Sequence, residues 1–289
     1  MIKAQKNYKP LEVVLECPLF VHNVYNKFKG QVCDNCLAKS SGLKKCAVCG
    51  HMYYCDRNCQ RNDWRAGHRY ECQIFKNHYQ KLVDVKDLAT TLLRLYFISK
   101  ADPQIVFKKY NTVGGQQRCF NDLMSHQENI VQDFSRFNKI QELHHIITSL
   151  CGLQISINDL IDFYGKYVIN SFSTCFTDFI HLSDQTFGSG LFIGASVLNH
   201  SCAPNVSFHS IGNKLMIISK RFITSGEELT VSYIDHNLPI DTRSMLLKNY
   251  YYFDCHCRRC IDGVNDSHDN DDKNLANYFM KQLTDSILK

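Results

Sequence analysis

Apolar positions along the chain change their period, and each change predicts a different kind of structure. Residues 11 to 25 alternate between apolar and polar positions, as at Val13 and Leu15, which is typical of a half-buried strand. The alternation ends before Gly30. Between residues 33 and 72 there is too little apolar periodicity for a core, and from about residue 73 a helical period begins.

Three helices are predicted between residues 73 and 170. Leu88, Leu92 and Leu95 form an apolar stripe that stops at Asp102-Pro103. A longer stripe ends at Gly152, since glycine favours the end of a helix. Its apolar positions are Ile130, Phe134, Phe137, Ile140, Leu143, Ile147 and Leu150. Ser156, three residues before Asp159, is typical of a capping residue that starts a third helix.

After residue 170 the pattern favours short strands. Apolar runs at 205–209, 214–221 and 228–234 are separated by turns at Gly212-Asn213 and Ser225-Gly226, which predicts antiparallel strands and hairpins. The fold class is therefore α+β. The polar stretch 263–273 is expected to be a linker, followed by one amphipathic helix with apolar positions at Leu275, Phe279, Leu283 and Ile287.

Composition is typical of a globular intracellular protein. The chain has 289 residues, 44% of them apolar, which is enough for a sizeable core. No apolar run has the roughly 18 residues of a membrane span, and Met1 to Lys6 lacks the apolar centre of a signal peptide. In a reducing compartment, closely spaced cysteines are expected to bind metal rather than to form disulfides.

A first cysteine group, of seven cysteines and one histidine between residues 33 and 72, supplies eight metal ligands, enough for two tetrahedral zinc ions. The ligands come in pairs separated by two or three residues, and such pairs usually alternate between two ions. The predicted first site is Cys33, Cys36, Cys55 and Cys59, and the second is Cys46, Cys49, His68 and Cys72. His51 is an alternative to His68, although its place directly after Gly50 favours a loop. With all coordination positions filled, both ions would be structural. Free buried thiols are the alternative interpretation.

The second group, Cys255, Cys257 and Cys260, has only three ligands close in sequence. A zinc ion there needs a fourth thiolate from elsewhere in the chain. Cys202 is the natural donor, and it lies in the motif Asn199-His200-Ser201-Cys202-Ala203-Pro204-Asn205. The four remaining cysteines are expected to be buried thiols. They are Cys17, Cys119, Cys151 and Cys175.

The formal charge of +5 suggests nucleic-acid binding only if every cysteine is counted as neutral. Zinc ligands are thiolates, and eleven of them with three zinc ions bring the net charge close to zero. Direct nucleic-acid binding is therefore not expected. The segment with the first two predicted zinc sites remains locally basic at Lys44-Lys45 and between residues 57 and 69, which is compatible with an acidic partner or with a solvated face.

Two sets of motifs resemble a known family. Tyr54-Cys55, Cys59-Gln60, Asp63-Trp64, His68 and Cys72 resemble a MYND zinc finger. A later set resembles a SET domain with its post-SET zinc segment: Gly190-Leu191, Asn199 to Cys202, Pro204-Asn205, Gly226 to Thr230, Ser232-Tyr233, Tyr251, Phe253 and the last three zinc ligands. The combination is similar to the SMYD family of protein-lysine methyltransferases.

The resemblance implies a division of the chain. Residues 1–32 would be the first part of a SET domain, 33–72 the MYND finger, 73–169 a helical insertion, 170–250 the SET core, 251–262 the post-SET zinc segment, and 263–289 a linker with one helix. The implied fold is a SET-type β fold of short strands and hairpins that carries these additions.

The implied activity is methyl transfer from S-adenosylmethionine to a lysine of a histone or another protein, with three structural zinc ions. Tyr233 would be the catalytic residue of the lysine channel. The cofactor would be held by Asn199, His200, His126 and Phe253, and the substrate channel would be lined by Phe172, Ser196 and Tyr251. His126 has an alternative role, as a residue before a helix with no ligand.

Family members also carry a glycine-rich turn near the N-terminus and a large C-terminal helical lobe. No glycine precedes Gly30 here, and only one expected helix follows Cys260. The resemblance therefore implies a shortened or divergent member with an incomplete first SET segment. An alternative function is a protein-interaction adaptor or transcriptional regulator with impaired catalysis, in which the finger binds a proline-containing peptide. A monomer in nucleus and cytoplasm, without membrane attachment, is expected.

Overall fold

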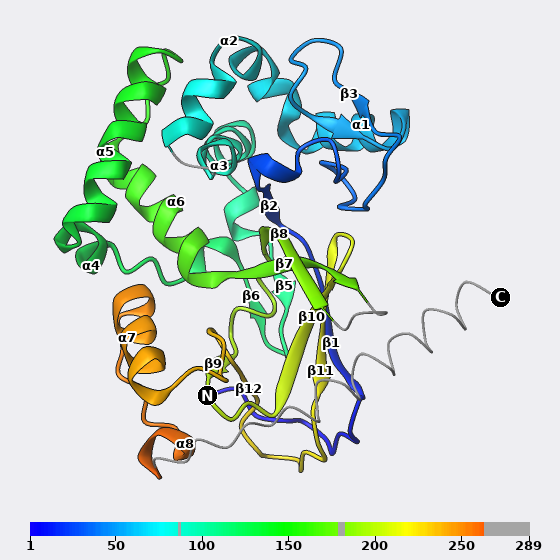
Figure 1. Ribbon diagram of the computed structural model, residues 1–289, viewed down its shortest axis with the longest axis vertical. Coiled ribbons are helices and arrows are strands. Elements are labelled where there is room, and N and C mark those ends of the chain that lie inside the picture. Colours follow the sequence, from blue (N-terminus) through cyan, green and yellow to red (C-terminus); the bar gives the residue numbers. More distant parts are fainter. Residues whose placement is uncertain (86–87, 179–182, 263–289) are drawn as a thin grey trace.

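The computed structural model describes residues 1–85, 88–178 and 183–262. The helices between residues 57 and 170 gather with the cysteine-rich finger at one end of the molecule, whereas most of the strands and the last two helices lie at the other end (Figure 1). The helix predicted for residues 275 to 287 lies outside the described residues. Among the described residues, every helix is too short or too polar to cross a membrane.

The strands are short. They are β1 (Val13–Pro18), β2 (Val21–Val24), β3 (Lys44–Lys45), β4 (Tyr53–Tyr54), β5 (Tyr110–Asn111), β6 (Gln117–Arg118), β7 (Ser171–Asp178), β8 (Ser183–Leu191), β9 (Asn199–His200), β10 (Val206–Ile211), β11 (Lys214–Ser219) and β12 (Thr230–Val231). The order β1-β11-β10 forms one antiparallel sheet and β2-β8-β7 a second. The strands predicted at 205–209 and 214–221 are thus confirmed, whereas the one predicted at 11–25 is two strands that belong to different sheets.

One strand pairing differs from the prediction. β12 was expected in an antiparallel hairpin, but it pairs in parallel with β9, with Thr230 opposite Asn199 and Val231 opposite His200. The cause is Asn205, which is buried and bonds to three backbone or side-chain groups of residues 227–230. These bonds hold the two motif segments side by side.

The helices are α1 (Arg57–Asp63), α2 (Arg69–Val85), α3 (Ala89–Ala101), α4 (Gln127–Gln132), α5 (Phe134–Ser149), α6 (Ile157–Asn170), α7 (Ile240–Tyr251) and α8 (Arg258–Ile261). Single turns occur at Asn26–Phe28, Trp64–His68, Ile105–Phe107 and Phe120–Asp122. Two sequence signals are confirmed: α3 ends before Asp102, and the Ser156 hydroxyl accepts a hydrogen bond from the Asp159 N–H at 3.0 Å to cap α6.

The long stripe predicted from residue 130 to 150 is two helices rather than one. Asp133 interrupts it with an extended backbone, and its carboxylate accepts a hydrogen bond from the Arg136 N–H at 3.1 Å. An aspartate that caps a new helix favours such a break, because it satisfies a backbone N–H in the first turn of the helix that follows. α4 and α5 therefore meet at an angle.

The finger packs on the helices rather than standing apart. Cys33, Cys46, Cys49 and Cys72 belong to the same buried cluster as residues of α2, α3, α5 and α6. A second buried cluster joins the sheets at the other end and includes Val206, Leu215, Ile217 and Leu229. The N-terminal residues also belong to it: the Ala4 N–H donates to the Glu227 carbonyl at 2.8 Å, and the Tyr8 N–H donates to the Ile223 carbonyl at 2.9 Å.

Gly165 allows α6 to approach the loop that precedes α4. A Cβ atom built on Gly165 would lie 2.0 Å from the backbone oxygen of Ser125. We expect Gly165→Ala to lower the free energy of unfolding by about 1–3 kcal/mol, because the backbone would have to move apart. Gly42→Ala is the control, since nothing lies within 4 Å of its added Cβ. Thermal unfolding measures both, and equal melting temperatures would contradict this packing.

Candidate functional site

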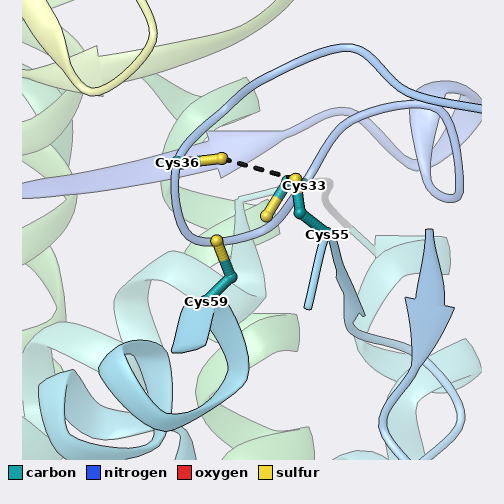
Figure 2. A group of neighbouring side chains, drawn as sticks. All are labelled: Cys33, Cys36, Cys55 and Cys59. Atoms are coloured by element: carbon teal, nitrogen blue, oxygen red, sulfur yellow. Dashed lines mark hydrogen bonds between the residues drawn. The ribbon is translucent and has the colours of Figure 1, made fainter. Parts of the chain in front are cut away.

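Two groups of ligands lie in the finger. The sulfurs of Cys33, Cys36, Cys55 and Cys59 converge from two loops and from α1 (Figure 2). Asp56 fixes the start of α1, since its carboxylate accepts hydrogen bonds from the N–H groups of Asn58 and Cys59, both at 2.8 Å. The local cap thus orients one ligand toward the other three.

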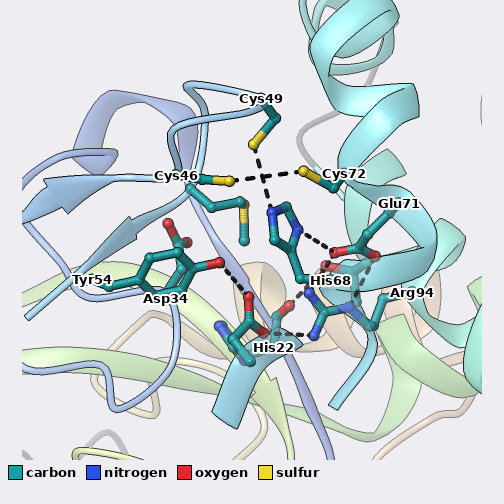
Figure 3. A network of polar contacts seen from close by, with 12 residues as sticks. His22, Asp34, Cys46, Cys49, Tyr54, His68, Glu71, Cys72 and Arg94 are labelled. Atoms are coloured by element: carbon teal, nitrogen blue, oxygen red, sulfur yellow. Dashed lines mark hydrogen bonds and ion pairs between the residues drawn. The ribbon is translucent and has the colours of Figure 1, made fainter. Parts of the chain in front are cut away.

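The second group is Cys46, Cys49, His68 and Cys72, all buried (Figure 3). Within each of the two groups, the ligand atoms lie within 4.8 Å of one another. His51, the alternative to His68, does not join them, because its ring stacks on Tyr79 with centroids 4.1 Å apart.

A buried charge network supports the second group (Figure 3). Glu71 lies 3.7 Å from His68 Nδ1 and is bound on its other side by the Arg94 guanidinium, which also reaches Asp63 at 2.8 Å. Burial alone would raise the pKa of Glu71, but Arg94 holds it below its ordinary value. Since Arg94 belongs to α3, the network ties the finger to the helical layer.

The third group joins the chain's two later motifs. Cys202 lies in the motif 199–205, whereas Cys255, Cys257 and Cys260 follow α7. The ligand atoms lie within 4.8 Å of one another, and the Cys202 N–H donates to Cys257 Sγ at 3.4 Å. The predicted fourth ligand therefore lies beside the other three.

The spacing of the ligand atoms fits zinc. In a tetrahedron with zinc at its centre, two sulfurs lie about 3.8 Å apart, and a sulfur and a nitrogen about 3.5 Å apart. The corresponding distances are 3.7 Å for Cys36 and Cys55, 3.8 Å for Cys46 and Cys72, 3.5 Å for Cys202 and Cys260, and 3.6 Å from Cys49 to His68 Nε2. With four ligands each, the sites can be structural.

One cavity, of about 520 Å³, is lined by every residue expected in the catalytic, cofactor or channel roles. These are Tyr233, Asn199, His200, His126, Phe253, Phe172, Ser196 and Tyr251. They come from β7, the segment between β8 and β9, β9 itself, the segment after β12, the loop before α4, the end of α7 and the residues just after it. Residues separated by more than 120 positions in sequence therefore meet at a single hollow.

Tyr233 lies at the centre of this arrangement. Its hydroxyl donates to the Leu198 carbonyl at 2.7 Å, and its own carbonyl accepts a hydrogen bond from the Tyr251 hydroxyl at 3.1 Å. The two rings lie 5.0 Å apart. Burial raises the pKa of Tyr233 to about 12, so the phenol stays protonated at neutral pH.

His200 connects the cavity with the third cysteine group. Its Nδ1 accepts a hydrogen bond from the Tyr233 N–H at 3.0 Å, so the ring proton lies on Nε2, which is 3.3 Å from Cys202 Sγ. Burial lowers the pKa of His200 to about 4, in keeping with a neutral ring. Next to it, the exposed Asn199 donates to Glu228 at 2.9 Å.

Two residues beside the cavity have left-handed backbones although neither is glycine. His126 has φ 52° and Tyr252 has φ 62°, and their rings lie 5.3 Å apart. The turn at Tyr252 lets both Tyr251 and Phe253 line the cavity, and the Tyr252 hydroxyl accepts from Arg136 at 2.7 Å. Such backbones cost free energy and concentrate at functional sites. His126 thus precedes α4, as in its alternative role, and also lines the cavity.

Sequence patterns do not indicate Arg118 or Phe208, which also line the cavity. Arg118 belongs to the β5–β6 hairpin, which is too short to show a strand period. Gly114 and Gly115 in its turn are the one sequence signal for a hairpin there. Thr112 and Val113, which precede this turn, are buried.

A second hollow of about 860 Å³ adjoins the cavity. Tyr233 and Tyr251 line both, and the second hollow is further lined by Arg136, Lys139 and Tyr250. Its size and its shared border suit a peptide whose side chain reaches the cavity.

Comparisons with known proteins agree with this arrangement. The MYND finger family matches residues 33–72. The chain is 27% identical to "Histone-lysine N-methyltransferase SMYD3" of mouse and of human, over 90% of its own length and 58% of theirs. It is 26% identical to bovine "N-lysine methyltransferase SMYD2" over 98% of its length and 61% of that protein.

The fold and the three cysteine groups define a SET-type protein with an inserted zinc finger. Along most of its length the chain is similar to SMYD lysine methyltransferases, which supports the resemblance carried by its motifs. The chain spans less than two thirds of the length of these curated relatives.

Zinc content tests the three groups. We expect native mass spectrometry to find three zinc ions per chain, and Cys257→Ser to leave two, because each group has its own four ligands. Cys151→Ser is the control: this half-buried thiol lies outside the groups, and the variant should keep three ions. Three ions in the Cys257→Ser variant would contradict the third site.

Proposed function

We propose that the protein is an S-adenosylmethionine-dependent protein-lysine N-methyltransferase. The observation that carries the proposal is the convergence of all eight expected catalytic, cofactor and channel residues on one cavity. The similarity to SMYD3 and SMYD2, both named as lysine methyltransferases, supports the same activity. A histone or another lysine-bearing protein is the proposed substrate.

The cavity has the volume of a cofactor site, within the roughly 300–1,000 Å³ of small-molecule pockets. Its wall combines aromatic rings with polar groups, as such pockets do. Asn199, His200, His126 and Phe253 would hold the cofactor. When bound, S-adenosylmethionine supplies a methyl group on a sulfonium and leaves as a neutral thioether.

The protein's contribution to this reaction is to position a neutral amine. The lysine nitrogen must first lose a proton to water, and its lone pair then forms the new nitrogen–carbon bond as the sulfur–carbon bond breaks. Because the Tyr233 proton is engaged by the Leu198 carbonyl, the phenol oxygen can accept a hydrogen bond from the amine. A low-polarity surrounding favours the neutral amine over the ammonium.

Aromatic side chains would surround the amine. Phe172 packs edge-on against Phe208, with centroids 5.2 Å apart, and Tyr251 packs against Tyr233. Ring faces attract the positive charge that develops on nitrogen during transfer. Ser196 would line the channel, although its hydroxyl already donates to the Ile193 carbonyl at 2.8 Å. The adjoining hollow would hold the peptide chain.

Tyr233→Phe tests the proposal. Loss of the hydroxyl should lower the rate of methyl transfer to a protein substrate roughly 100-fold, because the amine loses an orienting group, with little change in cofactor affinity. The rate is measured with labelled S-adenosylmethionine and the affinity by calorimetry. Tyr53→Phe, in the finger and outside the cavity, is the matched control and should keep full activity.

Absence of both cofactor binding and methyl transfer in the wild-type protein would contradict the enzyme function. Capture of a partner protein by that same inactive chain, lost on Cys46→Ala, would instead favour an adaptor built on the finger.

A further inference from the structure

Arg118 brings a charge into a cavity that otherwise has none. Of the described residues that line the cavity, Arg118 is the one arginine, lysine, aspartate or glutamate. The β5–β6 hairpin delivers it there, anchored by the buried Thr112 and Val113. Its side chain therefore sets the electrostatics of the proposed cofactor site.

Within the described part of the chain, the Arg118 guanidinium donates its hydrogen bonds to uncharged acceptors. Nη1 donates to the Ser196 carbonyl at 2.6 Å and to its hydroxyl at 3.2 Å, and Nη2 donates to the Asp122 carbonyl at 3.2 Å. The nearby Asp122 carboxylate is bound instead by Lys109 at 3.1 Å. A guanidinium has more N–H donors than these three bonds use.

Arg118 is half-buried and, among the described residues, hydrogen-bonds to no carboxylate. Burial lowers the pKa of Arg118 below its ordinary value, although the nearby Asp122 charge opposes this shift. Arginine matches a carboxylate especially well, since its planar donors can bind both oxygens at once. The remaining donors of Arg118 thus favour an anionic ligand in the cavity.

The proposed reaction brings few groups into the cavity, and one of them is anionic. The lysine side chain is an amine or an ammonium, the sulfonium is a cation, and the adenosine part is neutral. The methionine part of the cofactor carries a carboxylate. Resting on the proposed function, we propose that Arg118 binds this carboxylate and so orients the methionine end of S-adenosylmethionine.

A rival role for Arg118 is structural, because its bonds to Ser196 steady the segment that precedes Asn199. The two roles predict different results when the ligand is changed. Loss of a structural contact should weaken every ligand of the cavity alike, whereas loss of a carboxylate partner should weaken only ligands that carry the carboxylate.

Calorimetry with two ligands separates these roles. Wild-type protein is titrated with S-adenosylmethionine and with its decarboxylated analogue, and the first should bind roughly 10- to 100-fold more tightly, as a charge-assisted hydrogen bond would provide. Arg118→Gln should abolish this preference by weakening S-adenosylmethionine alone, with the analogue changed by less than about twofold. Arg118→Lys, which keeps the charge without the planar donors, should retain part of it.

Lys109→Gln is the control for charge in general: this half-exposed lysine approaches the same turn but does not line the cavity, and the variant should keep the full preference. Equal loss for both ligands in Arg118→Gln, or no preference in the wild-type protein, would overturn the role of Arg118. If Arg118→Gln fails to fold, an unchanged preference for S-adenosylmethionine in Arg118→Lys would likewise overturn the role of Arg118. Binding of neither ligand by wild type would refute the proposed function itself.

Discussion

The third cysteine group is the constraint on which the cavity depends. Cys202 lies beside β9, whereas its three partners follow α7, so a shared zinc ion would fix the end of α7 against the motif 199–205. Through His200, two hydrogen bonds connect the same group with the Tyr233 backbone. The hydrogen bonds from the Tyr251 hydroxyl to the Tyr233 carbonyl and from Arg136 to the Tyr252 hydroxyl add to this connection and hold Tyr251 and Phe253 at the cavity.

The finger and the cavity lie in different parts of one packed body. The Arg94 network and the shared buried cluster join the finger to α3, and α3 in turn contacts β2, since the Thr91 hydroxyl donates to the His22 carbonyl at 2.9 Å. A change at the finger's buried ligands therefore has a continuous path of contacts toward the sheet β2-β8-β7, whose strand β7 carries Phe172.

Local chemistry explains what the sequence predicts well. Cysteine spacing, the Ser156 cap and the end of α3 depend on residues close together in the chain, and all are visible in the pattern. Long-range effects explain the rest. The break at Asp133, the parallel pairing of β9 with β12 and the place of Arg118 depend on distant partners. α7 also escapes prediction, because its buried positions include the charged Arg243, which disguises an apolar stripe.

The most direct test of this account is calorimetric titration of S-adenosylmethionine into the zinc-loaded protein and into its Cys257→Ser variant. A cofactor cavity whose wall is held by the third cysteine group predicts binding to the wild-type protein and at least about tenfold weaker binding to the variant. Equal affinity in the two proteins would contradict the structural role of that group, and no binding to the zinc-loaded wild-type protein would contradict the cofactor site itself.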